Sequence, residues 1–423
     1  MPKFRTLLKN KSFVLYSVGQ AFSQFGDRLV QIVLIGFVYK RWPGSTFQLA
    51  KLFLFTIVPS FFASPIAGVY VDRWNKKYVM IISDIFRATA ILLIPIFFIQ
   101  KDSVIPIYTA IFSIFIAACF FLPARFSIIP SLVPKEDILI ANSASSIIWI
   151  ISGLAGFSIG GFLAEWAGVK NSLYINSLVY LFSALSFLGL AVSAKDKGRL
   201  LDEDTNRPSI KNVIKKSFVY DLQEGLKALF FEKNIRLVGG VFFIFSSVLG
   251  AIYVVGIVFI QETLQSMTRY ISIFSICLFG GLLLGSYAYG KKGHKFSRAK
   301  VVFVSLIFVG IFMDIFALGL REFRSLWAGG VSSFFCGFFV APIYVIANTV
   351  VHESVKNYLG GRVFSSLGIV INLGFLIFML ISSIVAEHID RFWIFLACGS
   401  FIAALGMVNA MTGFLKRVIS LSS

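Results

Sequence analysis

The feature that most constrains this chain is a succession of apolar stretches, each about 20 residues long, the length a helix needs to cross a bilayer. Hydrophobic residues make up 57% of the 423 residues and charged residues 14%. A water-soluble domain does not have this balance, because it needs a polar outer face. The stretches also lack the alternation of barrel strands, so only helices can satisfy their backbone groups in lipid. The sequence therefore predicts an all-α, polytopic membrane protein.

We expect twelve transmembrane helices in two pseudo-symmetric six-helix bundles. They are placed at residues 13–39, 51–71, 78–100, 104–124, 138–164, 171–193, 236–261, 268–289, 299–319, 325–349, 363–386 and 392–414. With a cytoplasmic amino terminus, the inner segments carry 28 of the 39 Lys and Arg residues and the outer segments carry 9, while Arg28 and Arg87 lie within helices. Because basic residues concentrate on the inner side of membranes, this bias predicts an inner-membrane protein with both termini in the cytoplasm.

The longest polar segment divides the chain into an amino-terminal bundle (1–194), a cytoplasmic linker (195–235) and a carboxy-terminal bundle (236–423). The linker's second part has helical spacing with a mixed face, which fits either an amphipathic helix on the inner leaflet or a solvated linker. At an offset of 218 residues, Phe121 falls on Phe339 and Arg73 on Lys291. This self-similarity favours two repeated halves, a common transporter design.

Other classes of function lack support in the sequence. The net charge of +19 does not indicate nucleic-acid binding, because the basic residues lie between apolar stretches and not along one face. No phosphate loop, nucleotide fingerprint or nucleophile–base pair is present, so we expect no enzyme, no catalytic residue and no cofactor. The four cysteines lie inside apolar runs and the three histidines are widely spaced, so no metal site is predicted.

A charged motif follows the second predicted helix and comprises Gly68, Asp72, Arg73, Lys76 and Lys77. Gly68 is expected to let helices approach closely. Asp72 and Arg73 are expected to pair at a helix end, where the partial charges of the backbone favour them. The alternative is an ordinary basic inner loop.

This motif resembles the G-x-x-x-D-R-x-x-R/K signature of the major facilitator superfamily. The resemblance extends to GQAFSQFGDRL in helix one, LPARFSIIPSLVPKEDILIANS after helix four and GGRVFSS before helix eleven. It is similar to the bacterial branch of enterobactin exporters and macrolide efflux proteins, with lysophospholipid transporters as neighbours. The resemblance implies that the motif latches a cytoplasmic gate and does not bind substrate. Asp84 and Arg87, one turn apart in helix three, are expected to join that network.

A polar stripe runs along helix one. Gln20, Gln24, Asp27 and Gln31 are spaced so that all four share one helical face, and Arg28 follows Asp27 by about 100° around the helix. An ionised carboxylate near the middle of a membrane is costly, on the order of 3 kcal/mol, so Asp27 must face protein or water. It is then either a proton-coupling group beside a substrate cavity or a permanent ion-pair partner that locks helices together.

Helix five contains a seam of small residues, Gly153, Gly156, Gly160 and Gly161. Such a seam permits tight helix contact and a bend. It resembles the G-P-x-x-G-G signature of facilitator-family antiporters, but Phe157 stands where that signature has proline. The alternative is a plain packing seam. Arg125 is expected at the inner end of helix four, snorkelling toward the headgroups.

Together these features predict a monomeric, proton-driven exporter in the lipid bilayer, which moves a hydrophobic or amphipathic small molecule such as a drug, macrolide or siderophore by alternating access. Two alternatives keep the same fold: a lysophospholipid transporter, or a metal-ion transporter that uses Asp27 with other ligands. A third alternative is a membrane scaffold without transport.

Overall fold

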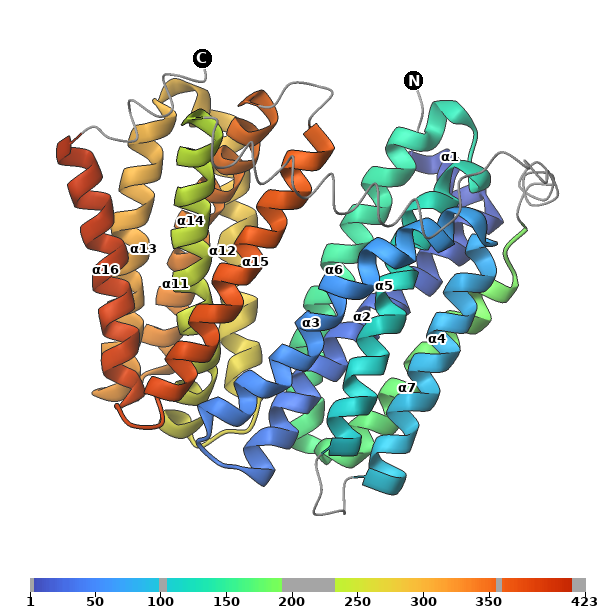
Figure 1. Cartoon of the computed structure of the whole chain (residues 1–423), viewed down its shortest axis with the longest axis horizontal. Helices are drawn as coiled ribbons and strands as arrows, with labels where there is room; N and C mark the ends of the chain where they lie inside the picture. The colour runs from blue at the N-terminus through green and yellow to red at the C-terminus, as the bar shows by residue number, and fades with distance from the viewer. Residues whose placement is uncertain (1–3, 99–104, 192–232, 355–359, 413–423) are drawn as a thin grey trace. The chain divides into compact units, whose positions relative to one another are not determined.

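The computed structural model describes residues 4–98, 105–191, 233–354 and 360–412, and Figure 1 shows the chain. Helices account for nearly all of this part, and it contains no strand, which confirms the all-α prediction. The α-helices are α1 Phe4–Lys9, α2 Lys11–Arg41, α3 Thr46–Arg73, α4 Lys76–Leu93, α5 Ile105–Leu132, α6 Ile138–Trp166, α7 Gly168–Leu188, α11 Lys233–Leu264, α12 Arg269–Lys292, α13 Arg298–Arg321, α14 Leu326–Ser354, α15 Gly360–Val385 and α16 Arg391–Thr412. The short elements are the π-helix η1 Ile94–Phe98 and the 3-10 helices η2 Lys135–Asp137 and η4 Gly293–Lys295.

Twelve of the described helices are long, and they match the twelve predicted spans in order. Eleven are long and apolar enough to cross a bilayer. The twelfth, α15, contributes a shorter apolar stretch, Ile369–Val385. The chain is therefore a multi-pass membrane protein.

Helix α5 differs from the prediction in a way that matters for the site. The sequence predicted its end at residue 124, just after Pro123, but α5 continues to Leu132 with Pro123 and Pro130 inside it. In a membrane protein an internal proline is tolerated where neighbouring groups satisfy the freed carbonyls. Arg125 consequently lies within the helix and is only 2% exposed, so the prediction that it snorkels to the headgroups is wrong.

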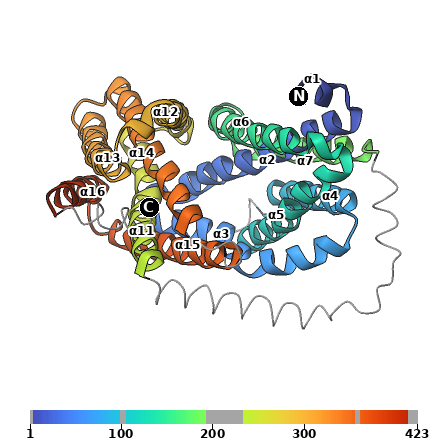
Figure 2. The same cartoon turned by 90° about the horizontal axis from the view of Figure 1, so that it is seen from above.

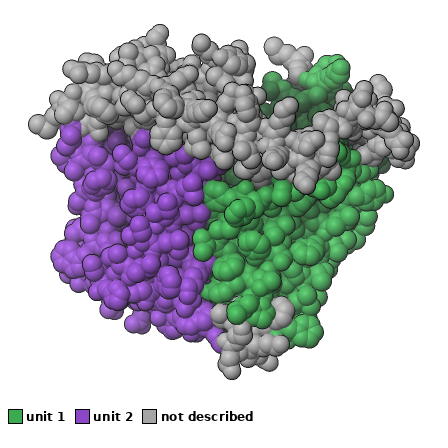
Figure 3. Space-filling view, in the orientation of Figure 1, with its two compact units in different colours: residues 1–37, 52–218 green, residues 38–51, 219–423 purple. Residues whose placement is uncertain are grey.

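By internal contacts the chain divides into two compact units, coloured in Figure 3. Unit 1 comprises residues 1–37 and 52–218, and unit 2 comprises residues 38–51 and 219–423. The predicted linker at 195–235 falls almost entirely outside the described residues, so its amphipathic helix stays a prediction.

The two units share a packing pattern. In unit 1 the third long helix, α4, packs against α5 and α7. In unit 2 the third long helix, α13, packs against α14 and α16, which hold the same places in the order of helices (Figure 2). Helices α5 and α14 also both contain an internal proline. These recurrences support the repeat that the sequence suggested.

In unit 2 the segment between α2 and α3 is fixed by Glu387, just after α15. One carboxylate oxygen of Glu387 accepts hydrogen bonds from the Phe47 N–H and the Ser45 hydroxyl, both at 3.0 Å. Partial burial raises the pKa of Glu387, but these bonds, a third from Thr46 and the charge of Arg391 together lower it by more, so its pKa lies below the ordinary value. The carboxylate thus caps the positive end of α3, which explains why α3 begins at Thr46, earlier than predicted.

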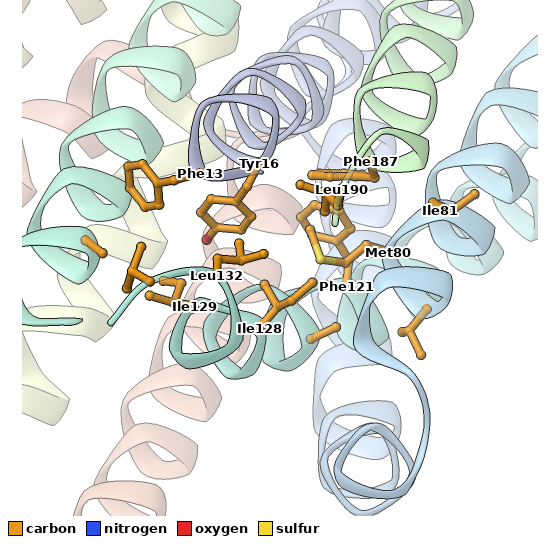
Figure 4. Packing of buried hydrophobic residues seen from close by; sticks show 14 of the residues in the cluster. Phe13, Tyr16, Met80, Ile81, Phe121, Ile128, Ile129, Leu132, Phe187 and Leu190 are labelled. Atoms are coloured by element: carbon orange, nitrogen blue, oxygen red, sulfur yellow. The ribbon is translucent and has the colours of Figure 1, made fainter. Parts of the chain in front are cut away.

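In unit 1 a cluster of buried apolar side chains from seven helices, α1 to α7, includes Val71 of the 68–77 motif, and Figure 4 shows part of it. Phe121 of α5 and Phe187 of α7 meet there with ring centroids 5.9 Å apart, and Tyr16 of α2 is fully buried beside them. Because lipid is as apolar as these side chains, their contribution is close packing and not removal from water.

The glycine seam of α6 packs against α2. A Cβ atom at Gly156 would lie 2.4 Å from the backbone oxygen of Phe25, and one at Gly160 would lie 2.5 Å from the Ile32 side chain. A Cβ at Gly153 would meet only the Arg28 side chain, at an ordinary 3.7 Å. The seam therefore lets α6 approach the helix that carries Asp27.

Gly156→Ala should destabilise the protein, because its new methyl group would overlap the α2 backbone, which cannot move aside as a side chain can. We expect a loss on the order of 1–3 kcal/mol, seen as a lower unfolding temperature of the purified protein in detergent. Gly153→Ala, one turn away, is the matched control and should be neutral or slightly stabilising. Equal unfolding temperatures for the two variants would contradict this packing.

Candidate functional site

The most heavily charged buried feature of unit 1 is centred on Arg87 of α4. Its guanidinium is fully buried and forms ion pairs with two carboxylates. Nη1 donates to Asp27 Oδ1 of α2 at 2.6 Å, and Nη2 donates to Asp84 Oδ1 of α4. The sequence predicted that Asp84 and Arg87 join the 68–77 motif, but in the structure Arg87 pairs with Asp27 and Asp84 pairs with Arg87.

Hydroxyl groups complete this arrangement, which we call the Arg87 cluster: Ser23, Asp27, Asp84, Arg87, Tyr180 and Ser183. The Tyr180 hydroxyl donates to Asp27 Oδ1 at 2.6 Å, and the Ser183 hydroxyl donates to Asp84 Oδ2. Arg87 Nη2 also donates to the Ser23 hydroxyl at 3.0 Å. The rings of Phe121 and Tyr180 flank the guanidinium, each with its centroid 4.6 Å from Cζ, a cation–π arrangement. Residues from α2, α4, α5 and α7 thus hold one cation.

Exposure differs within the cluster. The side chains of Arg87 and Asp84 are 0% exposed, whereas that of Asp27 is 23% exposed. With both carboxylates ionised the cluster carries a net charge of −1, which is unfavourable in a medium of low polarity. A proton on Asp27 would make it neutral. Asp27 is therefore the carboxylate of the cluster that its surroundings can reach.

The predicted stripe of helix one separates into different contacts. Gln24 Nε2 donates to Asp27 Oδ2 at 3.4 Å, so these two residues act together. Gln20 is fully buried and exchanges hydrogen bonds with Ser145 of α6. Arg28 Nη1 donates to Gln31 Oε1 at 2.9 Å, and Asp27 is held by Arg87 instead of Arg28.

The 68–77 motif lies at an end of unit 1, outside the Arg87 cluster. Lys77 Nζ donates to the carbonyl oxygens of Leu188 and Leu190, both at 2.8 Å, and so ties the start of α4 to the end of α7. Asp72 is exposed, and Lys76 Nζ donates to its backbone oxygen. A Cβ at Gly68 would meet nothing within 4 Å among the described atoms, so the predicted close approach is not seen there. The role of the motif as a gate latch stays a prediction.

Sequence reasoning missed Tyr180 and Ser183, two polar residues of α7 that the structure brings to the Arg87 cluster. Tyr180 and Ser183 contact the two carboxylates from α7, where they stand among apolar residues without a spacing that singles them out. Asn176, one turn before Tyr180, is fully buried, and both its side-chain polar atoms lack a partner among the described residues. Among all residues that the structure describes, no three His, Cys, Asp or Glu side chains lie close enough together to bind a metal ion.

Comparison with known proteins gives this geometry a family context. The family model described as Major Facilitator Superfamily matches residues 16–265. Macrolide efflux protein A of Streptococcus pyogenes is 23% identical over 418 residues, covering 97% of this chain and 98% of that protein. The putative bacilysin exporter BacE of Bacillus subtilis is 26% identical and covers 94% of each chain.

Solved structures support the same fold. The crystal structure of the nucleoside transporter NupG aligns with a TM-score of 0.66 at 16% identity, covering 96% of this chain and 98% of that one. At this level of identity the likeness concerns the fold alone.

Replacing Arg87 tests the electrostatics of the cluster. Arg87→Gln should lower the free energy of unfolding by roughly 3–5 kcal/mol, because it leaves two carboxylates in the interior without a cation. Combining it with Asp84→Asn should restore at least half of that loss, since one uncompensated charge is then removed. Unfolding temperatures of the wild type, both single variants and the double variant give the cycle. Strictly additive losses would show that Arg87 and Asp84 do not act as a pair.

Proposed function

Because the chain belongs to the major facilitator superfamily and is a transporter whose relatives include efflux proteins, we propose that it is a proton-coupled exporter of a hydrophobic or amphipathic small molecule. A drug, a macrolide or a siderophore is the class of substrate we favour. Transport would proceed by alternating access, with a substrate site open to one side of the membrane at a time.

The observation that carries the proposal is the pairing of Asp27 with Arg87. An ionised Asp27 accepts hydrogen bonds from Arg87 and Tyr180, whereas a protonated Asp27 is neutral and holds Arg87 less strongly. Asp84 would then be the one ionised carboxylate paired with Arg87. Proton binding thus changes how tightly α2 is held to α4 and α7, which is what a coupling group must do.

The glycine seam and the stripe have supporting roles in this proposal. Gly156 and Gly160 hold α6 close to the turns of α2 on either side of Asp27. Gln24 orients the Asp27 carboxylate. The proton gradient would be the energy source, and no bound cofactor would be needed. The working unit would be a monomer, which the molar mass of the purified protein from light scattering can test.

We further propose that the protein lies in the bacterial cytoplasmic membrane with both termini in the cytoplasm. The excess of basic residues in alternate loops supports this orientation. Cysteines introduced at positions 2 and 422 should react with an impermeant maleimide only after the cells are permeabilised. Labelling of either position in intact cells would contradict the orientation.

Asp27→Asn should abolish gradient-driven transport while the protein stays in the membrane, because the amide oxygen can accept the hydrogen bonds from Arg87 and Tyr180 but the side chain cannot exchange a proton. The measurement is accumulation of radiolabelled erythromycin, ethidium and a catecholate siderophore in inside-out vesicles with an imposed proton gradient. We expect at least one compound to accumulate in wild-type vesicles and its accumulation to fall at least tenfold in the variant.

Asp314→Asn is the matched control, since Asp314 is an intramembrane carboxylate of α13 that hydrogen-bonds to Ser400 in unit 2. Its vesicles should keep accumulating the compound. Wild-type accumulation of none of the three compounds would contradict the proposed substrate class. Gradient-driven accumulation that persists in Asp27→Asn would remove Asp27 from the coupling role.

A further inference from the structure

A second buried arginine in unit 1 lacks the partners that Arg87 has. Arg125 of α5 is 2% exposed, and its Nε and Nη1 atoms are buried without any hydrogen-bond acceptor among the described residues. The guanidinium lies over the ring of Phe126, with 4.2 Å between Cζ and the ring centroid. Arg87, buried to the same degree, is held by two carboxylates, a serine hydroxyl and a backbone carbonyl.

Such an arginine is unfavourable as it stands. A guanidinium remains protonated in a protein, so Arg125 cannot remove the cost of its burial by becoming neutral. A buried charge without a counter-charge, and donors without acceptors, both destabilise the interior. The described residues therefore leave two donors of a buried cation without an acceptor.

The neighbouring side chains have no free negative charge to offer. The Tyr16 hydroxyl lies 3.2 Å from the backbone oxygen of Arg125 and 3.0 Å from the Ser145 hydroxyl. Ser145 and Gln20 in turn satisfy one another. The carboxylate that acts on Arg125 electrostatically is that of Asp27, which Arg87 and Tyr180 already hold.

Apolar surface borders the guanidinium. Phe126, which Arg125 stacks on, is 47% exposed, and so is Leu122, about one turn earlier on α5. A compound that presents an anionic group to Arg125 would therefore find hydrophobic side chains beside it.

We propose that Arg125 binds a carboxylate or phosphate group carried by the transported compound, which makes the substrate an amphipathic anion. This inference rests on the proposed function as a transporter and narrows its substrate class. The planar guanidinium can donate two parallel hydrogen bonds to such a group, the strongest arrangement available to an arginine. The free Nε and Nη1 donors are the atoms that the anion would engage or order.

The test uses octanoate as an amphipathic anion and octanamide as its neutral counterpart. A ligand that binds the native state raises the unfolding temperature in proportion to its occupancy, so the purified full-length protein in an uncharged detergent reports binding directly. We expect a saturable rise with octanoate and none with octanamide. Arg125→Gln should abolish the rise, and Arg125→Lys should increase the apparent Kd at least tenfold, because lysine cannot form the two parallel bonds.

Two variants serve as controls. Arg324→Gln removes an exposed arginine of unit 2 and should respond to octanoate like the wild type. Without octanoate, Arg125→Gln should unfold at or above the wild-type temperature, because it removes a buried charge whose Nε and Nη1 donors have no acceptor among the described residues. Arg87→Gln, by contrast, should unfold earlier.

Three results would overturn the proposal. These are equal responses to octanoate and octanamide, an octanoate response that survives in Arg125→Gln, and an Arg125-dependent response to phosphatidylglycerol but not to octanoate, which would assign the site to a lipid headgroup. Because the assay applies no gradient, it separates this inference from the proposed function. If the wild type binds octanoate but shows no gradient-driven transport, only proton coupling is contradicted. If it shows gradient-driven transport but no Arg125-dependent octanoate binding, only the anion site is contradicted.

Discussion

The need to neutralise one buried guanidinium organises much of unit 1. Arg87 cannot lose its proton, and it lies where water does not reach it, so the surrounding helices must supply its counter-charges. Asp27 comes from α2, Asp84 from α4 and the Tyr180 hydroxyl from α7. These contacts fix α2, α4 and α7 relative to one another near Asp27. The glycine seam lets a fourth helix, α6, pack against the same turns of α2. The packing of the unit 1 helices and the pairing of the buried charges therefore depend on one another.

Hydropathy predicted the helices well because lipid imposes one rule, internal satisfaction of every backbone group, on all of them. The order of twelve long helices follows from that rule alone. The errors lie where a second interaction decides the boundary. Helix α5 runs past Pro123 to Leu132, and α3 begins at Thr46 because Glu387, more than 300 residues away in sequence, caps it. A partner so distant in sequence is not visible to a local pattern.

The site was predicted in part, for a related reason. Helical spacing was enough to place Gln24 and Asp27 on one face of α2 and to pair Asp84 with Arg87. It did not show that these two pairs meet, because that depends on how α2 and α4 are oriented about their axes. The serine and tyrosine of α7 are common residues in apolar helices and become informative only when their hydrogen bonds are seen. The burial of Arg125 was not predicted because the sequence analysis ended α5 at residue 124, before Arg125.

The proposals for Asp27 and Arg125 limit one another through electrostatics. With both carboxylates ionised, the Arg87 cluster carries −1, and an anion at Arg125 cancels a positive charge that offsets it. By linkage, anion binding at Arg125 and proton binding at Asp27 must then favour each other, not exclude each other. A strict exchange of proton for substrate therefore cannot rest on charge alone.

Exchange requires a mechanical link through which loading of one site disfavours loading of the other. The described hydrogen bonds provide a route for one. Tyr16 and Gln20 lie on the Asp27 helix, Ser145 joins them from α6, and Tyr16 reaches the backbone of Arg125. If a proton on Asp27 loosens α2 from Arg87, any movement of α2 would be passed through these contacts to the turn of α5 that carries Arg125. If this connection opposes loading of both sites by more free energy than the electrostatic attraction contributes, the chain exchanges a proton for the substrate. Otherwise it transports the two together.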